Sequence, residues 1–507
     1  GKYIKGKRVL IVTSLGFQSR GIVDKLKNFI SDKDIFVYDN VEPNPDINDL
    51  DDILHKFKSK KINSIIGLGG GSAIDTAKVL ACSLANSKIK SINEGIFPLI
   101  ADDPKINSFF EEAQLKGNFY ATYDPVVYGY ADVIIIDINL DVKKKSFNNY
   151  SLKNFEVDLT GFENAISSIG MNLFGETLVL VETTVPPGTT ANVVRPILEK
   201  ELEKRKIPLS NLKLGHSYER VMPGPEYIDS IREFPRVYAG VDNKSADSIL
   251  DFLNTIIDTD KCELTRLENT NATEMAKVLE NSYRAMNIAF AVEWSRFAEE
   301  AGVDMFEIVN AIRQRKTHAN LMYPGIGVGG YCLTKDPLLA SWGRKSFFDA
   351  NSDLEMSIKS VSTNDQMPSF AFNRLVEVFG SLSNIKVTFL GVSYRGDVGD
   401  TRYTPVKPLL DMVNNDGAIT SIHDPFIPYW EEQDCKVENN IDVVLKNNPE
   451  IIIISTGHSL YKEEETLNKL MQLKPCKIFD TVGIFNQLQL STLKEKHILS
   501  VLGRGDI

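Results

Sequence analysis

The chain has 507 residues, enough for roughly three domains at about 150 residues each. Hydrophobic residues make up 43% of the chain and charged residues 25%, proportions that are ordinary for a soluble globular protein. The formal net charge of −11 argues against a general binder of nucleic acid or anionic membrane, although it leaves room for a local basic pocket.

The cysteines and the apolar runs bear on the compartment. Five cysteines are few, odd in number and widely scattered, which fits a reducing cytosol better than a disulfide scaffold. The apolar run Val9–Val12 is too short for a signal peptide, and no stretch approaches the ~20 apolar residues of a membrane span. The sequence therefore predicts a cytoplasmic protein.

The first part of the chain alternates between strand-like and helix-like segments. Strands are predicted at Arg8–Thr13, Asp34–Tyr38 and Asn63–Leu68, with a helix at Gly21–Ile30. The third strand runs into Gly69-Gly70-Gly71-Ser72. This alternation predicts a parallel, doubly wound sheet, and a glycine turn between strand and helix is where such sheets hold phosphate. A tight turn without a ligand is the alternative explanation.

A second set of strands follows. Val133–Ile136 and Thr177–Glu182 are candidates for buried strands, and the polar segment Lys143–Phe155 between them is predicted to be a loop. Thr177–Glu182 runs into a segment that contains Pro186-Pro187-Gly188. Two prolines and a glycine at the carboxyl edge of a strand predict a rigid loop where open α/β sheets place ligands.

The longest helical pattern runs from Asn271 to Gly302. Asn271 or Thr273 is predicted to cap it, Gly302 ends it and no proline interrupts it. Lys277 and Asn281 lie four residues apart and therefore share one face of the helix. A solvated polar stripe is the alternative explanation for this pair.

A glycine-rich loop with a cysteine occupies Tyr323–Pro337. Glycine-dense backbone can approach a ligand closely, and a thiol beside a lysine is expected to ionise more readily to the nucleophilic thiolate. Cys332 is followed closely by Lys335 and Asp336. A structural cysteine in a glycine loop is the alternative that this segment alone leaves open.

A second α/β unit begins at Asn384–Leu390. Gly391–Gly396 and Asp400–Pro405 lie at its first turn, while His423-Asp424-Pro425 and Ser455–His458 follow later strands. The pattern predicts an α/β fold with two Rossmann-like, doubly wound parallel-sheet domains joined by a long central helix.

Residues 1 to about 85 resemble the dinucleotide-binding part of the iron-containing alcohol dehydrogenases. The matching stretches are Gly6–Thr13, Val41–Pro45 and Gly69–Lys78. The resemblance implies that the NAD(P) pyrophosphate binds at Gly70, Gly71 and Ser72. Gly67 and Gly69 of the same turn are further candidates for cofactor binding. The histidines that hold iron in that family have no counterpart, because the six histidines here are dispersed with no pair at i, i+4 spacing.

From about residue 88 onward the sequence resembles the nucleotide-sugar 6-dehydrogenases, the UDP-glucose and UDP-N-acetylhexosamine dehydrogenase family. Five motifs occur in the order of that family: Glu182–Thr189, Glu219–Gly224, Glu274–Asn281, Gly327–Pro337 and Asp400–Arg402. The Glu-Arg-Val-Met-Pro-Gly form of the second motif is closer to the N-acetylhexosamine branch.

The resemblance implies a four-electron oxidation. The C6 alcohol of a UDP-sugar becomes a carboxylate while two NAD are reduced, through a thiohemiacetal and then a thioester on Cys332. Lys277 and Asn281 would stabilise the oxyanion, and Asp336 would position or deprotonate water. Arg402 would pair with the substrate diphosphate. The family also suggests a homodimer built on the long helix and a product used for polysaccharide biosynthesis.

The resemblance assigns candidate roles to further residues. The catalytic candidates are Cys332, Lys277, Asn281, Asp336, Glu219 and Thr184. Thr184 and Lys335 are also candidates for cofactor binding, in addition to the glycine turn. The substrate-binding candidates are Glu219, Arg220, Lys277, Asn281, Tyr323, Gly325, Gly327, Gly329 and Arg402. No metal ligand is predicted.

The N-terminal segment departs from the nucleotide-sugar family, whose members begin with their own Gly-x-Gly-x-x-Gly turn. Here Gly67-Leu68-Gly69 would supply the first two glycines, but Ser72 stands at the third position. The chain therefore reads as an in-frame join near Val79–Asn93. The predicted domains are an alcohol-dehydrogenase-like segment (1–88), the remainder of the NAD-binding domain (89–260), a central helical dimerisation domain with the cysteine loop (261–370) and a UDP-sugar-binding domain (371–507).

Two alternatives to a UDP-sugar dehydrogenase remain. One is a UDP-sugar-binding chimera whose catalysis is impaired because the cofactor site was lost at the join. The other is a metal-dependent alcohol dehydrogenase, which rests on the first 85 or so residues alone.

Overall fold

The computed structural model describes residues 7–31, 33–41, 53, 56–57, 60, 62, 64–69, 72–74, 76–77, 89–97, 103–148, 151–222 and 224–507, and the side chains of 145–148, 151 and 153 are not included. Most of the predicted join at Val79–Asn93 lies outside these residues. The chain divides into two compact units: Gly1–Ile100 with Pro104–Asp124, and Ala101–Asp103 with Pro125–Ile507.

The first unit contains a three-stranded parallel sheet in the order β2-β1-β3. Its strands are β1 (Arg8–Thr13), β2 (Asp34–Tyr38) and β3 (Ser64–Leu68), and its helices include α1 (Leu15–Ser19), α2 (Ile22–Phe29) and α5 (Pro104–Leu115). Alternate residues of β1 pack into two separate cores, Leu10 and Val12 on one face and Val9 and Ile11 on the other. A run that is apolar on both faces is what a covered parallel strand requires. The predicted spans of β1 and β2 are confirmed.

The second unit begins with a five-stranded sheet in the order β10-β9-β8-β7-β4, in which β9 is antiparallel to β8. Its strands are β4 (Val133–Ile136), β7 (Leu178–Val181), β8 (Lys213–Tyr218), β9 (Arg236–Gly240) and β10 (Leu264–Arg266). The helices around them are α6 (Thr160–Asn172), α7 (Arg195–Lys204), α8 (Tyr227–Glu233) and α9 (Asn243–Leu253). Val179 and Val181 pack toward α6 and α7, whereas Leu178 and Leu180 pack toward α9. Among the described strands, β1, β2 and β3 pair with one another and β4 ends the second sheet.

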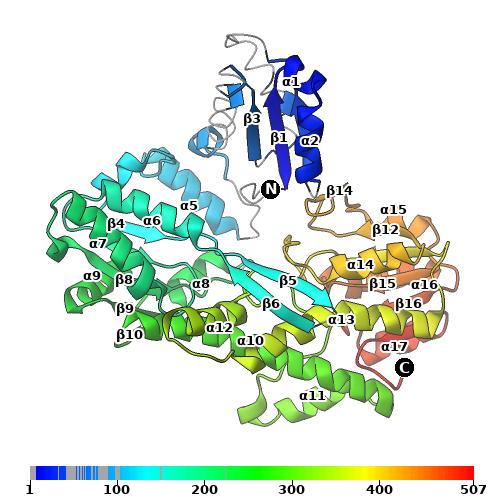
Figure 1. Cartoon of the computed structure of the whole chain (residues 1–507). Helices are drawn as coiled ribbons and strands as arrows, with labels where there is room; N and C mark the ends of the chain where they lie inside the picture. The colour runs from blue at the N-terminus through cyan, green and yellow to red at the C-terminus, as the bar shows by residue number, and fades with distance from the viewer. Residues whose placement is uncertain are drawn as a thin grey trace. The chain divides into compact units, whose positions relative to one another are not determined.

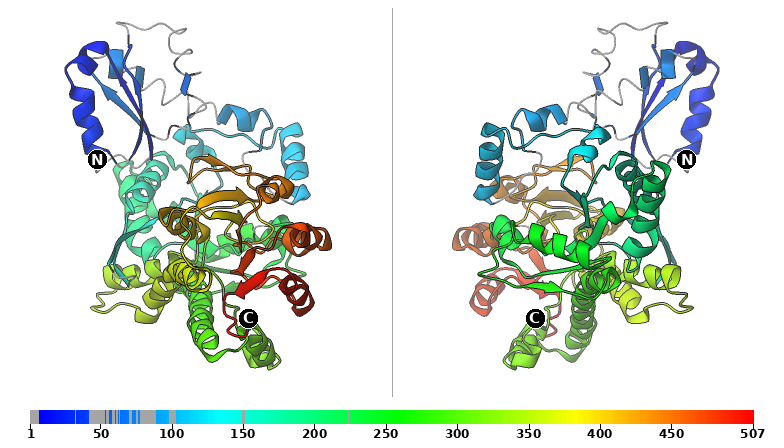
Figure 2. Two further views of the ribbon diagram at one scale, coloured as in Figure 1. Left: turned by 90° about the vertical axis from the view of Figure 1, so that its right-hand side faces the viewer. Right: turned by 90° about the vertical axis from the view of Figure 1, so that its left-hand side faces the viewer.

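A third sheet, entirely parallel, has the order β12-β11-β15-β16-β17. Its strands are β11 (Lys386–Leu390), β12 (Ile419–His423), β15 (Ile451–Ile454), β16 (Lys477–Asp480) and β17 (Ile498–Val501), and its helices are α14 (Val406–Asn415), α15 (Ile441–Lys446), α16 (Glu464–Gln472) and α17 (Gln487–Lys494). Ile451 and Ile453 pack with α14, while Ile452 and Ile454 pack with α15 and α16. Helices therefore cover both faces of this doubly wound sheet (Figure 2).

Three long helices and a hairpin join the two large sheets (Figure 1). They are α10 (Thr270–Ala301), α12 (Asp336–Phe347), α13 (Glu355–Phe379) and the hairpin β5 (Val142–Asn148) with β6 (Ser151–Val157), and α11 (Met305–Arg313) follows α10. Helix α13 packs along α10, and β6 packs against α12 and α13. The predicted α/β class with a long central helix is confirmed.

Two local predictions were wrong. Lys143–Phe155 is not a loop but most of the β5–β6 hairpin, which is stabilised by apolar packing of Leu152 against Leu338 and Val361. Helix α10 is capped by Asn269, whose side chain accepts the N–H of Ala272, rather than by Asn271 or Thr273. Gly302 ends α10 as predicted, with the left-handed φ of 68° that suits a glycine.

In the described part of the chain, no helix is both long and apolar enough to cross a bilayer.

Candidate active site

Cys332 lies in the turn that leads from the glycine loop into α12. Its carbonyl accepts the N–H groups of Lys335 at 3.1 Å and Asp336 at 2.9 Å, so the cysteine is fixed at the entrance of the helix. The side chain is exposed and makes no disulfide. A thiol in this position is open to an incoming substrate, unlike Cys262 and Cys476, which are buried.

The glycines before Cys332 are required by close contacts with other segments. Gly327 has a φ of 137°, and a Cβ there would lie 2.9 Å from the carbonyl of Asn364. A Cβ at Gly329 would lie 2.4 Å from the Cβ of Tyr394, and Gly330 also faces that ring. The loop is therefore pressed against α13 and against the turn after β11. Tyr394 was not predicted as a site residue, because its proximity depends on this contact between distant segments.

Asp336 and Asn281 meet directly beneath the cysteine loop. The Asn281 amide donates to Asp336 Oδ2 at 2.6 Å, and Lys335 Nζ lies 2.9 Å from Asp336 Oδ1. Asp336 is fully buried, and the Lys335 ammonium also lies 4.5 Å from the centre of the Tyr331 ring. The structure thus brings Cys332, Asn281 and Asp336 together. Lys335 is committed to Asp336, so the proposed role in cofactor binding gains no support from its contacts.

Lys277 lies one turn before Asn281 on the same face of α10. Its ammonium donates to the carbonyl of Glu219 at 2.8 Å, lies 3.8 Å from Glu219 Oε1 and faces the Tyr218 ring at 5.4 Å. The Glu219 carboxylate in turn accepts the N–H of Val221. These contacts leave the buried Lys277 with a fixed position and with unused N–H donors.

The environment of Cys332 raises the pKa of its thiol above the ordinary value of 9.0. Although the side chain reaches the surface, desolvation of the sulfur by the protein around it is the largest cause and the charge of Asp336 is the next. Together they outweigh Lys335 and Lys277. The prediction that the neighbouring lysine makes the thiol ionise more readily was therefore wrong, because desolvation and the charge of Asp336 outweigh the charge of the lysine. At neutral pH, nucleophilic attack depends on a minor thiolate fraction.

We expect alkylation of Cys332 by iodoacetamide to accelerate about tenfold per pH unit through the neutral range, since only the thiolate reacts. The half-maximal rate should lie above pH 9.0, the ordinary thiol value. Peptide mass spectrometry over a pH series gives this rate for Cys332, with the buried Cys262 as an internal reference that stays slow. A half-maximal rate below pH 8 would contradict the environment described above, since about one pH unit separates that value from an unperturbed thiol.

Glu274 fixes the Pro-Pro-Gly loop against the start of α10. Its fully buried carboxylate accepts the N–H groups of Gly188 at 2.6 Å and Thr190 at 2.7 Å. Burial raises the pKa of Glu274 to about 7, although these hydrogen bonds favour the charged form. The loop that follows β7, including the half-buried Thr184, is thus attached one turn before Lys277. The sequence placed Glu274 in a motif but assigned it no role.

Arg402 belongs to the segment after β11 that touches the cysteine loop. Its carbonyl accepts the N–H of Gly330 at 2.9 Å. Its guanidinium pairs with the Asp400 carboxylate, with Nη2 to Oδ2 at 2.7 Å, yet more than half of the side chain is exposed. An exposed, oriented guanidinium on a residue whose backbone contacts the glycine loop suits an anionic ligand.

Two predicted substrate contacts have side chains that are directed to other partners. Arg220 is 3.1 Å from Glu280 and donates to Tyr218 at 3.0 Å. The Tyr323 hydroxyl donates to Asn310, and its ring faces α11. Gly325 has no side chain, and its part in substrate binding stays a prediction.

The predicted cofactor turn lies in the first unit. A Cβ at Gly67 would lie 3.1 Å from both Ile74 Cα and Ala77 Cβ, so strand and helix approach as closely as a phosphate-binding turn requires. Gly69 has a φ of 151°, and the described part of the helix starts at Ser72. Gly70 and Gly71 lie outside the described residues. The residues present fit a dinucleotide pyrophosphate at the start of a helix.

No group of three His, Cys, Asp or Glu side chains in the described part of the chain could hold a metal ion.

Three successive stretches of the chain match three domains of one family. Residues 66–258 match the NAD binding domain, residues 271–364 the central domain and residues 388–487 the UDP binding domain of the UDP-glucose/GDP-mannose dehydrogenase family. The chain belongs to this family. It is an NAD-dependent oxidoreductase that acts on nucleotide sugars, as the sequence predicted. Residues 1–107 also match the iron-containing alcohol dehydrogenases.

Similar proteins include the UDP-N-acetyl-D-mannosamine dehydrogenases of Methanocaldococcus jannaschii and Methanococcus aeolicus. The first is 29% identical over 451 residues, which cover 87% of this chain and 94% of the relative. The second is 27% identical over 438 residues, with coverages of 84% and 92%. Among solved structures, UDP-D-ManNAc dehydrogenase from Pyrococcus horikoshii has a TM-score of 0.68 at 24% identity, covering 98% of this chain and all of that one. This likeness supports the fold.

Proposed function

We propose that the protein oxidises the C6 alcohol of a UDP-N-acetylhexosamine to the uronate, through covalent intermediates on Cys332. The observation that carries this proposal is the convergence of an exposed thiol with Asn281 and Asp336 at the entrance of α12, with Lys277 one turn away on α10. These groups are a nucleophile, a hydrogen-bond donor, a carboxylate and a cation, which is the set that acyl-type chemistry at a carbonyl needs.

The covalent steps balance with Cys332 as nucleophile. The first oxidation turns the alcohol into an aldehyde, and the thiolate adds to the aldehyde carbon to form a C–S bond and an oxyanion. After protonation this is a thiohemiacetal, and removal of a hydride from its carbon and a proton from its oxygen leaves a thioester. Water then breaks the C–S bond and releases the carboxylate and the thiol. NAD, when bound, would accept the hydride of each oxidation, one NAD molecule for each, so that two NADH form per sugar.

Lys277 and Asn281 would act on the oxyanion that each addition creates. Both extend from one face of α10 and both are held in place, so they need little reorganisation when charge develops. Asp336 fixes the Asn281 amide and would position the water that cleaves the thioester. Glu219, held next to Lys277, would assist in positioning the lysine.

Arg402 would bind the diphosphate of the nucleotide. In the structure its guanidinium is held by Asp400, and its exposed portion can meet phosphate oxygens. The carbonyl of Arg402 also accepts the N–H of Gly330, which lies two residues before Cys332. With its diphosphate at Arg402, the substrate would therefore have its sugar near Cys332. Thr184 follows β7 at the carboxyl edge of the second sheet, where open α/β sheets bind their ligands.

The choice of an N-acetylhexosamine follows from the relatives, whose names specify UDP-N-acetyl-D-mannosamine, and from the Glu-Arg-Val-Met-Pro-Gly motif. The test is a panel of UDP-N-acetyl-D-mannosamine, UDP-N-acetylgalactosamine, UDP-N-acetylglucosamine and UDP-glucose with NAD. We expect two NADH per sugar and a uronate product with UDP-N-acetyl-D-mannosamine. Preferred turnover of UDP-glucose would contradict the substrate class, and one NADH per sugar would contradict the second oxidation.

A second candidate function is UDP-sugar binding without turnover. It is favoured by one observation: Ser72 stands at the position where the nucleotide-sugar family has the third glycine of its phosphate-binding turn. Calorimetry separates the two candidates. Binding of both UDP and NAD supports the enzyme, whereas binding of UDP without NAD supports the binding protein.

We also propose that the protein forms a homodimer through α10. Large apolar side chains on one face of this helix expose between 46% and 63% of their surface: Met275, Leu279, Tyr283, Phe290, Trp294 and Phe297. Their spacing makes a continuous stripe over most of the helix, and a self-complementary stripe suits a two-fold interface. Its length is unusual for a monomer surface.

The dimer is tested by Trp294→Asp, which places a charge within the stripe near its C-terminal end. We expect the wild type to be a dimer by light scattering. The dissociation constant of the variant dimer should be at least about tenfold higher than that of the wild type. Leu488→Asp is the matched control, because Leu488 on α17 is an exposed apolar residue outside the stripe. A monomeric wild type, or equal effects of the two variants, would refute this interface.

A further inference from the structure

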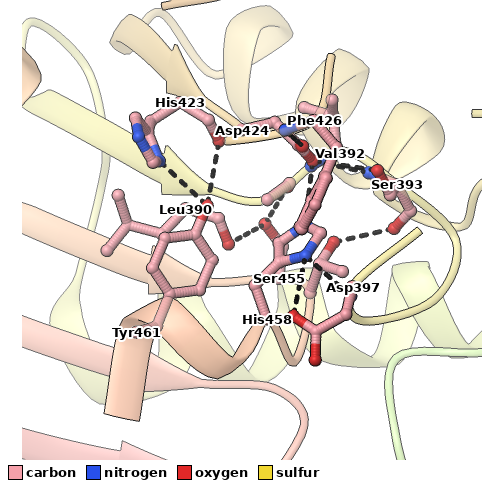
Figure 3. A network of polar contacts seen from close by, with 12 residues as sticks. Leu390, Val392, Ser393, Asp397, His423, Asp424, Phe426, Ser455, His458 and Tyr461 are labelled. Atoms are coloured by element: carbon pink, nitrogen blue, oxygen red, sulfur yellow. Dashed lines mark hydrogen bonds and ion pairs between the residues drawn. The ribbon is translucent and has the colours of Figure 1, made fainter. Parts of the chain in front are cut away.

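Two buried side chains, Asp424 and His458, lie side by side at the carboxyl edge of the third sheet (Figure 3). Asp424 directly follows β12, and His458 comes shortly after β15. His458 Nε2 is 3.0 Å from Asp424 Oδ2, and neither side chain exposes any surface. Because open parallel sheets bind ligands at this edge, the pair lies beneath the region that faces the nucleotide.

The hydrogen bonds define which ring nitrogen carries the proton. His458 Nδ1 accepts the backbone N–H of Asp397 at 2.9 Å, so this nitrogen is unprotonated. Nε2 therefore carries the proton and donates it to the Asp424 carboxylate. Burial opposes ionisation of Asp424, but the bonds from His458 and from the backbone hold its pKa below the ordinary value.

The same carboxylate holds the segment that follows β11. Asp424 Oδ2 also accepts the N–H of Val392 at 2.8 Å and the N–H and hydroxyl of Ser393 at 3.1 Å and 3.0 Å. The other end of the segment is held at Asp397, through His458 and through Ser459, whose N–H and hydroxyl donate to the Asp397 carboxylate. The two side chains thus hold residues 392–397 at both ends.

This held segment begins what we call the arm, residues 392–403. Tyr394 of the arm packs against Gly329 and Gly330, and the carbonyl of Arg402 accepts the N–H of Gly330. Tyr394 also donates its N–H to the carbonyl of Asp400, which orients Arg402. The arm therefore carries Arg402, the residue proposed to bind the diphosphate. It also contacts the glycine loop at Gly330, two residues before Cys332.

We propose that Asp424 and His458 are a positioning pair that keeps the arm in the shape that binds the nucleotide. The proposal rests on the proposed function in one respect, that Arg402 of the arm meets the UDP diphosphate. Neither residue of the pair touches the substrate. Loosening the pair releases the arm, weakens nucleotide binding and leaves the groups around Cys332 in place, because these are held by α10 and α12.

His458→Ala removes both hydrogen bonds of the ring, the one from the Asp397 N–H and the one to Asp424. The Asp424 carboxylate then lacks the donor that His458 supplied. We expect KM for the UDP-sugar and the Kd for UDP, measured by calorimetry, to rise about tenfold or more, consistent with loss of a charge-assisted hydrogen bond. The kcat and the KM for NAD should stay within about threefold of wild type. His458→Gln, whose amide can both donate and accept, should restore UDP binding in large part.

Tyr461→Phe is the matched control for general loss of stability. Tyr461 is as buried as His458 and belongs to the same network, but its hydroxyl bonds to His423 and not to the arm. The control should lower the melting temperature without changing the Kd for UDP. Equal Kd values for wild type and His458→Ala, or a similar rise in Tyr461→Phe, would overturn the positioning role.

The experiment also separates this inference from the proposed function. A wild type that binds UDP but makes no uronate refutes the dehydrogenase mechanism, while the UDP titrations of the variants still decide the role of the pair. A wild type that binds no UDP refutes both. UDP binding that weakens in His458→Ala and recovers in His458→Gln supports the positioning pair whatever sugar is the substrate.

Discussion

Replacing Cys332 with alanine is expected to abolish uronate formation from the UDP-sugar, with kcat for the complete reaction falling at least about 1,000-fold. The variant lacks the sulfur on which the thiohemiacetal and thioester form, so the second oxidation loses its covalent intermediate. The side chain is exposed, and its removal leaves no buried cavity. The melting temperature should therefore stay close to that of wild type.

Two measurements make this result specific. NADH absorbance gives the rate, and mass spectrometry of the sugar product distinguishes uronate from aldehyde or unreacted substrate. Cys435→Ala is the matched control, since Cys435 is a partly buried free thiol on the short strand β14 (Cys435–Lys436), which pairs with β13 (Tyr429–Trp430). It should retain wild-type turnover. Uronate production by Cys332→Ala at an undiminished rate would refute the covalent mechanism.

Much of the fold could be predicted because buried parallel strands need apolar residues on both faces. The apolar runs Arg8–Thr13 and Ile451–Ile454 predict buried strands for this reason. A glycine, Gly302, likewise predicts the end of α10. The hairpin at residues 142–157 could not be predicted so easily. Its run of lysines obscures the alternation of apolar and polar residues that predicts a strand. One of them, Lys144, forms an ion pair at 2.6 Å with Asp365, which is 221 residues away in the sequence.

The candidate site was predictable to the extent that its residues share local elements. Lys277 and Asn281 lie on one face of α10 because they are four residues apart, and Asp336 follows Cys332 by the same interval. The sign of the Cys332 pKa shift was not predictable. The sign depends on how much protein surrounds the thiol and on the ion pair that Lys335 forms with Asp336. Tertiary packing determines both.

The same limit applies to contacts between domains. Arg220 stands beside Glu219 in sequence, yet its guanidinium pairs with Glu280 of α10. Tyr394 and His458 carry no sequence signal of a role, and their importance emerges from packing against Gly330 and from hydrogen bonds to the arm. Long-range contacts of this kind require the three-dimensional structure.

Replacing Lys277 with methionine is expected to lower kcat by about 100- to 1,000-fold, the usual cost of removing one group that stabilises a developing oxyanion. KM for the UDP-sugar should change much less, because the ammonium acts on charge that appears after binding. Methionine fills a volume similar to that of the lysine stem, so the buried position remains packed. Steady-state kinetics that separate kcat from KM provide the measurement.

Lys345→Met is the matched control for the loss of a lysine near the site. Lys345 lies at the far end of α12, where its ammonium pairs with Asp353 at 2.7 Å and is largely exposed. This variant should keep kcat near the wild-type value, since an exposed ion pair contributes little. If Lys277→Met also kept its kcat, or if it raised only KM, the lysine would be a binding group. Oxyanion stabilisation would then fall to Asn281, whose amide is already held by the buried carboxylate of Asp336.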